Sequence, residues 1–248
     1  TAALFDAQAF ADEQPGYIST YTETMTRGQT PAAEIIFEMG LEYSINPRIL
    51  LTIMEYEGGW LSNPKPDLEH INYSMGWEKA DRGTVYFQTG WAIHQLMKGY
   101  YGWRSGKLTE LTFADGSTLR LSPYLNAGTV AVMYTLAQNH DRGSWEEAMY
   151  GENSLAAIHT QYFGDAFELG ASVDPIFSAD VQQPEMNLPF PANEVWHLTG
   201  GPHAAWGSGW ADDYALAALD FAPPLASPGC GNSTPYTKAG ESGMALPG

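Results

Sequence analysis

Residues 46–59 carry the start signal, the body and the stop signal of one helix. Asn46 is a favoured N-cap residue, and Pro47 suits the first helical position, where a backbone N–H has no helical partner. The pair Gly58-Gly59 supplies the left-handed stop that helix C-termini prefer. The sequence therefore predicts a helix with both ends defined, which begins after Asn46 and ends at these glycines.

Glu57 continues the apolar face of this predicted helix. Leu50, Ile53 and Glu57 fall at i, i+3 and i+7, whereas Glu55 lies on the same side as Arg48. A carboxyl group beside apolar side chains is partly desolvated, which favours the protonated form that a general acid needs. Glutamates are also common at helix ends as solvated or paired residues, so position alone leaves both interpretations open.

Helical periodicity dominates the first two thirds of the chain. Thr30 and Pro31 form a helix-start signature, and Asp115-Gly116 is the expected turn of a hairpin over Leu111–Leu121. Besides residues 46–59, the segments expected to be helical are the run from Pro31 to Gly40, Thr89–Gly99, Asn126–Ala137 and Trp145–Phe163.

The spacing of proline and glycine divides the chain into three regions. Residues 1–168 are predicted to form a mainly helical domain, 169–190 an extended linker, and 190–248 a small β domain with strand-like runs such as Ala215–Phe221. From Gly229 onward there is little apolar pattern, as in a loop that ends before its next strand. The expected fold class is α+β, with a helical domain and a small incomplete β domain.

The composition limits the classes of partner. A hydrophobic fraction of 44% with 16% charged residues is typical of a globular protein, and a net charge of -18 argues against nucleic acid as a partner. No stretch approaches the roughly 20 apolar residues that cross a bilayer, so membrane insertion is not expected either. Because the chain opens with Thr1, as a processed export product would, we expect a secreted, extracellular or cell-wall-associated protein. Its single cysteine, Cys230, is interpreted as a small buried side chain.

The segment Ile45–Trp60 resembles the catalytic helix of goose-type lysozymes and soluble lytic transglycosylases, which ends in Glu-Ser-Gly-aromatic. In this alignment Glu57 takes the position of the general acid, Gly58 replaces the serine, and Trp60 takes the aromatic place. Glu55 is the alternative acid if the register is shifted by two residues.

Two further motifs follow in the order of that superfamily. The segment Tyr124–Gly128 is similar to its Tyr-Asn-Ala-Gly motif, with one extra leucine, and Tyr86–Trp91 stands at the place of its Gly-Leu-Met-Gln motif, sharing only the glutamine. The resemblance covers residues 30–165 and implies a lysozyme-like fold with peptidoglycan as substrate. The residues that it implies for substrate binding are Trp60, Gln88, Tyr124 and Asn126.

The implied chemistry at the glycan site needs no cofactor. Glu57 would protonate the glycosidic oxygen, while an N-acetyl carbonyl or a 6-hydroxyl of the glycan attacks the anomeric carbon. An inverting hydrolase would need a second carboxylate about 6.5–9.5 Å away. The carboxylates that the following loop offers are Asp67, Glu69, Glu78 and Asp81.

The third region resembles a different wall hydrolase. Gly201-Pro202-His203 followed by Leu219-Asp220-Phe221 is similar to the first two ligand motifs of lysostaphin-type and staphylolytic-protease-type zinc endopeptidases, which cut peptide bridges of peptidoglycan. This resemblance implies that His203 and Asp220 are zinc ligands. The family takes its third ligand from a later His-x-His segment, and no histidine follows His203 here, so the zinc site is expected to be incomplete and the peptidase half inactive in this chain. An incomplete sheet also leaves an edge for pairing with another chain or a missing C-terminal segment.

Three functions are consistent with these patterns. The first is an exported peptidoglycan-directed hydrolase that cleaves glycan strands with Glu57 as its acid. The second is a non-catalytic wall-binding or structural protein derived from such a hydrolase. In the third, the chain is one fragment of a longer zinc endopeptidase.

Overall fold

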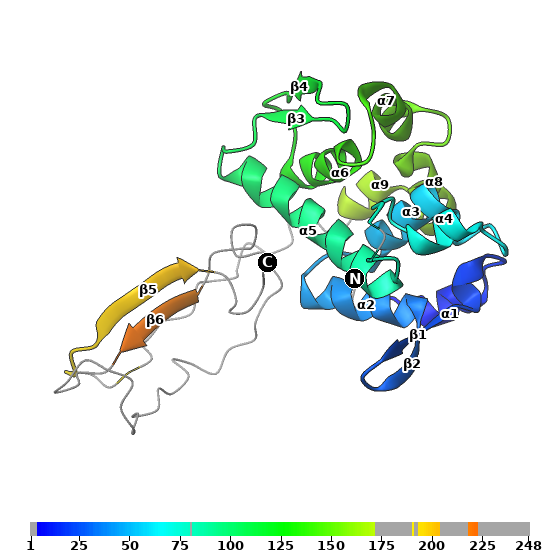
Figure 1. The fold of residues 1–248 in the computed structure, drawn as a ribbon. Coiled ribbons are helices and arrows are strands. Elements are labelled where there is room, and N and C mark those ends of the chain that lie inside the picture. The colour runs from blue at the N-terminus through cyan, green and yellow to red at the C-terminus, as the bar shows by residue number, and fades with distance from the viewer. Residues whose placement is uncertain (1–3, 80, 172–189, 191–192, 204–217, 223–248) are drawn as a thin grey trace. The chain divides into compact units, whose positions relative to one another are not determined.

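A computed structural model describes residues 4–79, 81–171, 190, 193–203 and 218–222 (Figure 1). The chain divides into two compact units, Thr1–Val173 and Asp174–Gly248, which are described separately. Most of the expected linker, the run from Gly229 onward and Cys230 lie outside the described residues.

The expected α+β class is confirmed, since the structure is mainly helical with small two-stranded sheets. The elements of the first unit are α1 (Ala7–Asp12), η2 (Tyr17–Ser19), β1 (Thr22–Met25), β2 (Gly28–Pro31), α2 (Ala32–Glu42), α3 (Pro47–Gly58), α4 (Leu68–Asn72), α5 (Val85–Arg104), β3 (Glu110–Thr112), β4 (Thr118–Arg120), α6 (Ala127–Ala137), α7 (Arg142–Tyr150), α8 (Leu155–Phe163) and α9 (Ala166–Ala171).

Helix α3 has the ends that its sequence predicted. The Asn46 side chain accepts a hydrogen bond from the backbone N–H of Arg48, Pro47 occupies the first turn, and Gly59 closes the helix with a φ of 64°. Leu50 and Ile53 are buried in the core. The apolar stripe thus faces inward and carries Glu57 towards the interior of the unit.

Three sequence predictions need correction at helix boundaries. Thr30 is not a helix cap, because its backbone pairs with Glu23 in the β1–β2 hairpin, and α2 begins two residues later. Helix α5 is longer at both ends than Thr89–Gly99, since Thr84 caps it and supplies an earlier start. The expected helix Trp145–Phe163 is two helices, because α7 ends at Tyr150 with Gly151 as its C-cap, and Ser154 caps α8.

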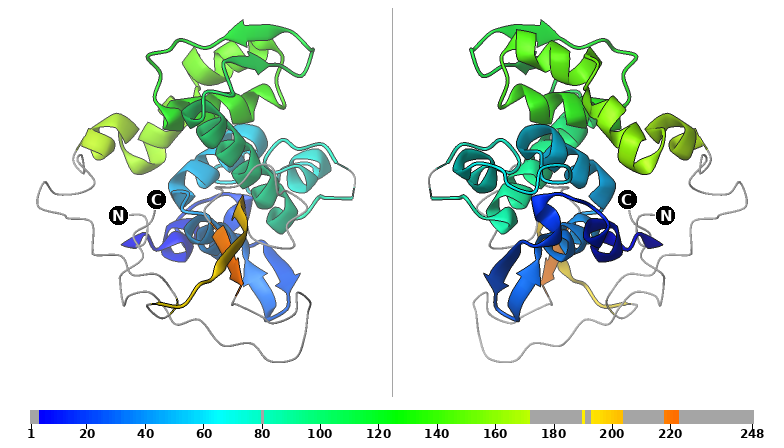
Figure 2. Two further views of the ribbon diagram at one scale, coloured as in Figure 1. Left: turned by 90° about the vertical axis from the view of Figure 1, so that its left-hand side faces the viewer. Right: turned by 90° about the vertical axis from the view of Figure 1, so that its right-hand side faces the viewer.

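Helix α5 runs through the middle of the first unit (Figures 1 and 2). Helices α6 and α7 and the β3–β4 hairpin lie on one side of it, and α1, α2 and the β1–β2 hairpin lie on the other. Close packing against α6 requires Gly99, because a Cβ there would lie 2.7 Å from the backbone of Ala131. The turn of the β3–β4 hairpin is the predicted one, with Gly116 at a φ of 82°.

The second unit contains one described pair of strands, β5 (His197–His203) and β6 (Ala218–Ala222), which are antiparallel with an irregular register. The ring of Phe190 stacks on Trp196 at 5.2 Å between centroids and meets Phe221 edge-on at 5.5 Å. Within the described ranges, no helix has the length and apolar character needed to span a bilayer.

Candidate functional site

The carboxylate of Glu57 lies in a closed, polar setting at the end of α3. Its side chain is 9% exposed, and its Oε1 lies 3.0 Å from Nε2 of His140, whose side chain is 17% exposed. On the other side stands Gly76, with a φ of 78°; a Cβ there would be 2.6 Å from Oε2 of Glu57 and would overlap the amide of Asn139. The positive φ favours a glycine at this position, and any larger residue would also push the Glu57 and Asn139 side chains aside.

When it is protonated, the imidazole of His140 forms an ion pair with the Glu57 carboxylate. Burial lowers the pKa of His140, but the hydrogen bond to Glu57 and the charges of Glu57 and Asp141 outweigh it, so the pKa lies above its ordinary value of 6.5. Oε1 of Glu57 is therefore engaged by a ring nitrogen of His140. A substrate that took a proton from Glu57 would have to compete with His140 for this carboxyl group.

Glu55, the alternative acid, lies in α3 and forms hydrogen bonds to residues outside that helix. Its Oε2 accepts hydrogen bonds from the backbone N–H groups of Leu61 at 2.7 Å and Ser62 at 3.2 Å. Its Oε1 accepts a long bond of 3.5 Å from the hydroxyl of Tyr162 in α8. Glu55 therefore fixes the turn after α3 and links it to α8.

Two of the expected substrate-binding residues, Trp60 and Gln88, are fully buried. The indole N–H of Trp60 donates to the carbonyl of His70 at 2.8 Å. The Gln88 amide makes four hydrogen bonds to backbone groups of Met75, Trp77 and Arg82, which uses all of its donors and acceptors. This geometry favours structural roles, because neither side chain is accessible to a sugar.

The other two expected substrate-binding residues flank the start of α6. The side chain of Asn126 caps α6 by accepting from the backbone N–H of Thr129 at 2.8 Å. Tyr124 is 96% exposed and is thus available to a partner in solution. Among the loop carboxylates considered above, Asp67 caps α4 and hydrogen-bonds His70, and Asp81 lies 3.7 Å from Arg82.

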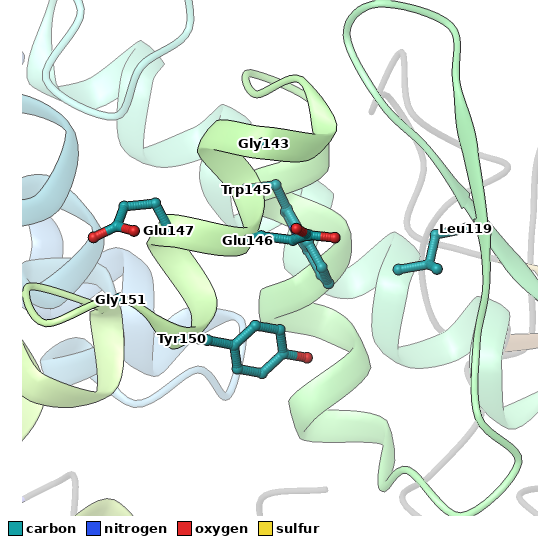
Figure 3. Close-up of a pocket in the computed structure, with 7 residues that line it drawn as sticks. All are labelled: Leu119, Gly143, Trp145, Glu146, Glu147, Tyr150 and Gly151. Atoms are coloured by element: carbon teal, nitrogen blue, oxygen red, sulfur yellow. The ribbon is translucent and has the colours of Figure 1, made fainter.

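A surface hollow of about 570 Å³ lies between α7 and β4 (Figure 3). Figure 3 shows the carboxylate of Glu146 on the side of Leu119 and that of Glu147 on the opposite side of the helix. Tyr150, which is 70% exposed, forms part of the wall. None of the residues predicted from sequence to bind substrate lines this hollow. Its lining residues are Leu119, Gly143, Trp145, Glu146, Glu147, Tyr150 and Gly151.

Sequence reasoning missed His140, because no motif or ligand spacing in the sequence marks it as a candidate residue. Its position 83 residues from Glu57 gives no spacing that could join the two. In the sequence, His140 stands out only because it comes shortly after the predicted helix 126–137. In the structure it lies in the turn between α6 and α7.

The two expected zinc ligands belong to paired strands of the second unit. His203 is the last residue of β5 and pairs with Ala218, and Asp220 in β6 pairs with Gly200. In the parts of the chain that the structure describes, no group of three His, Cys, Asp or Glu residues is arranged to hold a metal ion.

Residues 1–176 match the family model described as LasA, N-terminal domain. The chain belongs to this family. LasA itself is a staphylolytic peptidase made as a precursor, and the matched model describes the N-terminal domain of that secreted, cell-wall-active protein. No curated protein and no solved structure matches the chain. The family match falls on the helical unit, whereas the segments that resemble zinc-endopeptidase motifs, around His203 and Asp220, lie after it.

Proposed function

We propose that the helical unit of this LasA-family chain is the non-catalytic pro-region of a zinc endopeptidase, and that it keeps the peptidase inactive until it is removed. The match of residues 1–176 to the N-terminal domain of a peptidase precursor carries this proposal. It develops the third of the functions considered from the sequence, in which the chain is part of a longer zinc endopeptidase.

The state of the glycan-site residues supports a non-catalytic unit. Glu57 is hydrogen-bonded to the imidazole of His140, Glu55 holds a turn, and Trp60 and Gln88 are buried. Each of these side chains has a partner within the fold. A sugar would therefore have to displace several hydrogen bonds before it met an acid.

The residues of strands β5 and β6 support the idea that the pro-region belongs to a zinc peptidase. The strands carry His203 and Asp220, and imidazole and carboxylate are both first-choice ligands of zinc. Catalytic zinc takes three protein ligands, so a third residue would complete the site. Bound zinc would lower the pKa of a water molecule and polarise the peptide carbonyl.

The proposal is tested by adding the purified chain to an active staphylolytic zinc endopeptidase and measuring hydrolysis of a glycine-rich bridge peptide. We expect the initial rate to fall in a saturable way as the chain is added. The heat-unfolded chain, added at the same concentrations, is the control for protein added without a fold. Equal rates with folded and unfolded chain would contradict a pro-region role.

Glycan cleavage by Glu57 is the second candidate function. It is favoured by one observation: Glu57 ends α3 at the place of the acid in the lysozyme-like motif and keeps 9% of its side chain exposed. The test is incubation of the chain and a Glu57→Gln variant with peptidoglycan, followed by mass spectrometry. Anhydro-muropeptides or new reducing ends from the wild-type chain alone would establish this activity, and release from neither would exclude it.

A further inference from the structure

The Glu57–His140 pair joins segments that are distant in the sequence. Glu57 is at the end of α3, and His140 lies between α6 and α7. The backbone carbonyl of His140 accepts a hydrogen bond from the N–H of Ala114 in the β3–β4 hairpin at 3.0 Å. The neighbouring Asn139 donates its side-chain amide to the carbonyl of Met75 at 3.1 Å. The pair is thus the centre of contacts among α3, the segment before α5, the hairpin and the α6–α7 junction.

Little space is left around this pair. A Cβ added at Gly76 would lie 2.6 Å from Oε2 of Glu57 and closer still to the Asn139 amide, so a side chain at position 76 would force these two side chains to move. The ring of Tyr56 meets the imidazole of His140 edge-on at 5.8 Å between centroids. A change in the charge of His140 therefore acts on closely packed groups with limited access to water, where charge interactions are screened less than at the surface.

The groups around His140 are mainly acidic. The charges of Glu57 and Asp141 both raise the pKa of His140, and Asp115 of the hairpin is close enough to Asp141 for their charges to interact. Burial raises the pKa of Tyr56, and the charges of Glu57 and Glu147 raise it further. Glu147 of α7 is therefore another carboxylate near the end of α3. The closest arginine in the sequence, Arg142, forms its ion pair with Glu146 on the exposed side of α7. Loss of the proton from His140 would leave these carboxylates facing one another without the imidazolium.

We propose that the Glu57–His140 pair is a pH-responsive connection that weakens as the pH rises through neutrality, loosening the hairpin and α7 from α3. The direction follows from linkage. A histidine that gains a carboxylate partner on folding adds stability below its unfolded pKa, and this stability is lost as the pH rises through its folded pKa. The proposal concerns the helical unit itself and holds for either candidate function.

The experiment is thermal unfolding of the full chain between about pH 5.5 and pH 9, for the wild type and His140→Gln. We expect the variant to melt lower by about 2–4 °C at the acidic end, with the difference closing at the alkaline end. His70→Gln is the matched control, because His70 also pairs with a carboxylate, Asp67, but both side chains are about half exposed or more, at 49% and 66%. Parallel melting curves of wild type and His140→Gln across the whole range would overturn the proposal.

A second measurement covers the case in which His140→Gln does not fold. The ring resonances of the six histidines are followed by NMR in the wild type and in Glu57→Gln. We expect the His140 resonance to titrate above 6.5 in the wild type and at a lower pH in the variant. A His140 titration that is the same in both chains would overturn the proposal without any need for the histidine variant.

Discussion

At the scale of single residues, the polar groups in the core of the helical unit hold backbone in place. Gln88 hydrogen-bonds both N–H and carbonyl groups of the segment that precedes α5, and it does so from a fully buried position. Buried polar groups are stable only with partners, so a glutamine at this point fixes the path of a loop that has little regular structure. The loop in turn places Gly76 beside Glu57.

Replacing Gln88 tests this structural role. Gln88→Leu keeps the size of the side chain but leaves the backbone groups of Met75, Trp77 and Arg82 without their partner, which should reduce the free energy of unfolding by at least about 2 kcal/mol. Urea unfolding measures the change. Gln138→Leu is the control, since Gln138 makes one hydrogen bond, to the carbonyl of Tyr134, and its loss should cost clearly less. Equal losses in the two variants would show that Gln88 does not organise the loop.

Gly76 allows a second comparison at the same scale. Both Gly76 and Gly106 have a positive φ, at 78° and 71°, so alanine strains the backbone at either position by about 1–2 kcal/mol. At Gly106 a Cβ meets nothing within 4 Å, whereas at Gly76 it meets the Glu57 carboxylate. Gly76→Ala should therefore lose about 1–3 kcal/mol more than Gly106→Ala in denaturant unfolding. Similar losses would mean that the contact between Gly76 and Glu57 is not tight.

At the scale of helices and strands, local signals in the sequence predicted which helices exist better than they predicted where each helix begins and ends. Asn46, Pro47 and the two glycines set the ends of α3 because caps depend on neighbouring residues only. The helix start predicted at Thr30 is wrong because the backbone of Thr30 pairs with Glu23 in the β1–β2 hairpin. The residues next to Thr30 in the sequence do not indicate this pairing. The candidate site shows the same limit, since Glu57 was found from its helix, whereas His140 reaches it only through the packing of α6 against the rest.

The role of Asn126 is decided at this scale. If its function is to cap α6, Asn126→Ala should lose about 1 kcal/mol of unfolding free energy, and Asn126→Ser, which keeps a capping oxygen, should lose almost none. Chemical denaturation of the three chains gives both values. A serine variant as unstable as the alanine variant would contradict the capping role. Loss of peptidoglycan binding in a stable serine variant would instead support the sugar contact that the lysozyme-like motif implies.

At the scale of the whole molecule, the excess of acidic residues gives the chain a net charge of -18, and several of its aspartates cap helices or turns, among them Asp67, Asp115 and Asp141. Hydrogen bonds from the backbone and side chains of His70, Ser117 and Ser144 lower the pKa of Asp67, Asp115 and Asp141 respectively. Each therefore adds stability that is present above the unfolded pKa and is lost as the pH falls through the folded one. These groups act well below neutrality, so the behaviour near neutral pH depends on the histidines.

His159, which is buried, and His140, which is partly buried, have opposite effects on stability near neutral pH. Burial lowers the pKa of His159 below 6.5, so the unfolded chain binds the proton more readily, and stability should fall as the pH drops below about 6.5. The pKa of His140 is raised, so its contribution should fall as the pH rises above 6.5. We expect a stability maximum near neutrality in urea midpoints measured between about pH 5 and pH 9. His159→Gln should flatten the acidic side of the profile and His140→Gln the alkaline side. If each variant kept the profile of the wild type, the maximum would have to arise from groups other than these two histidines.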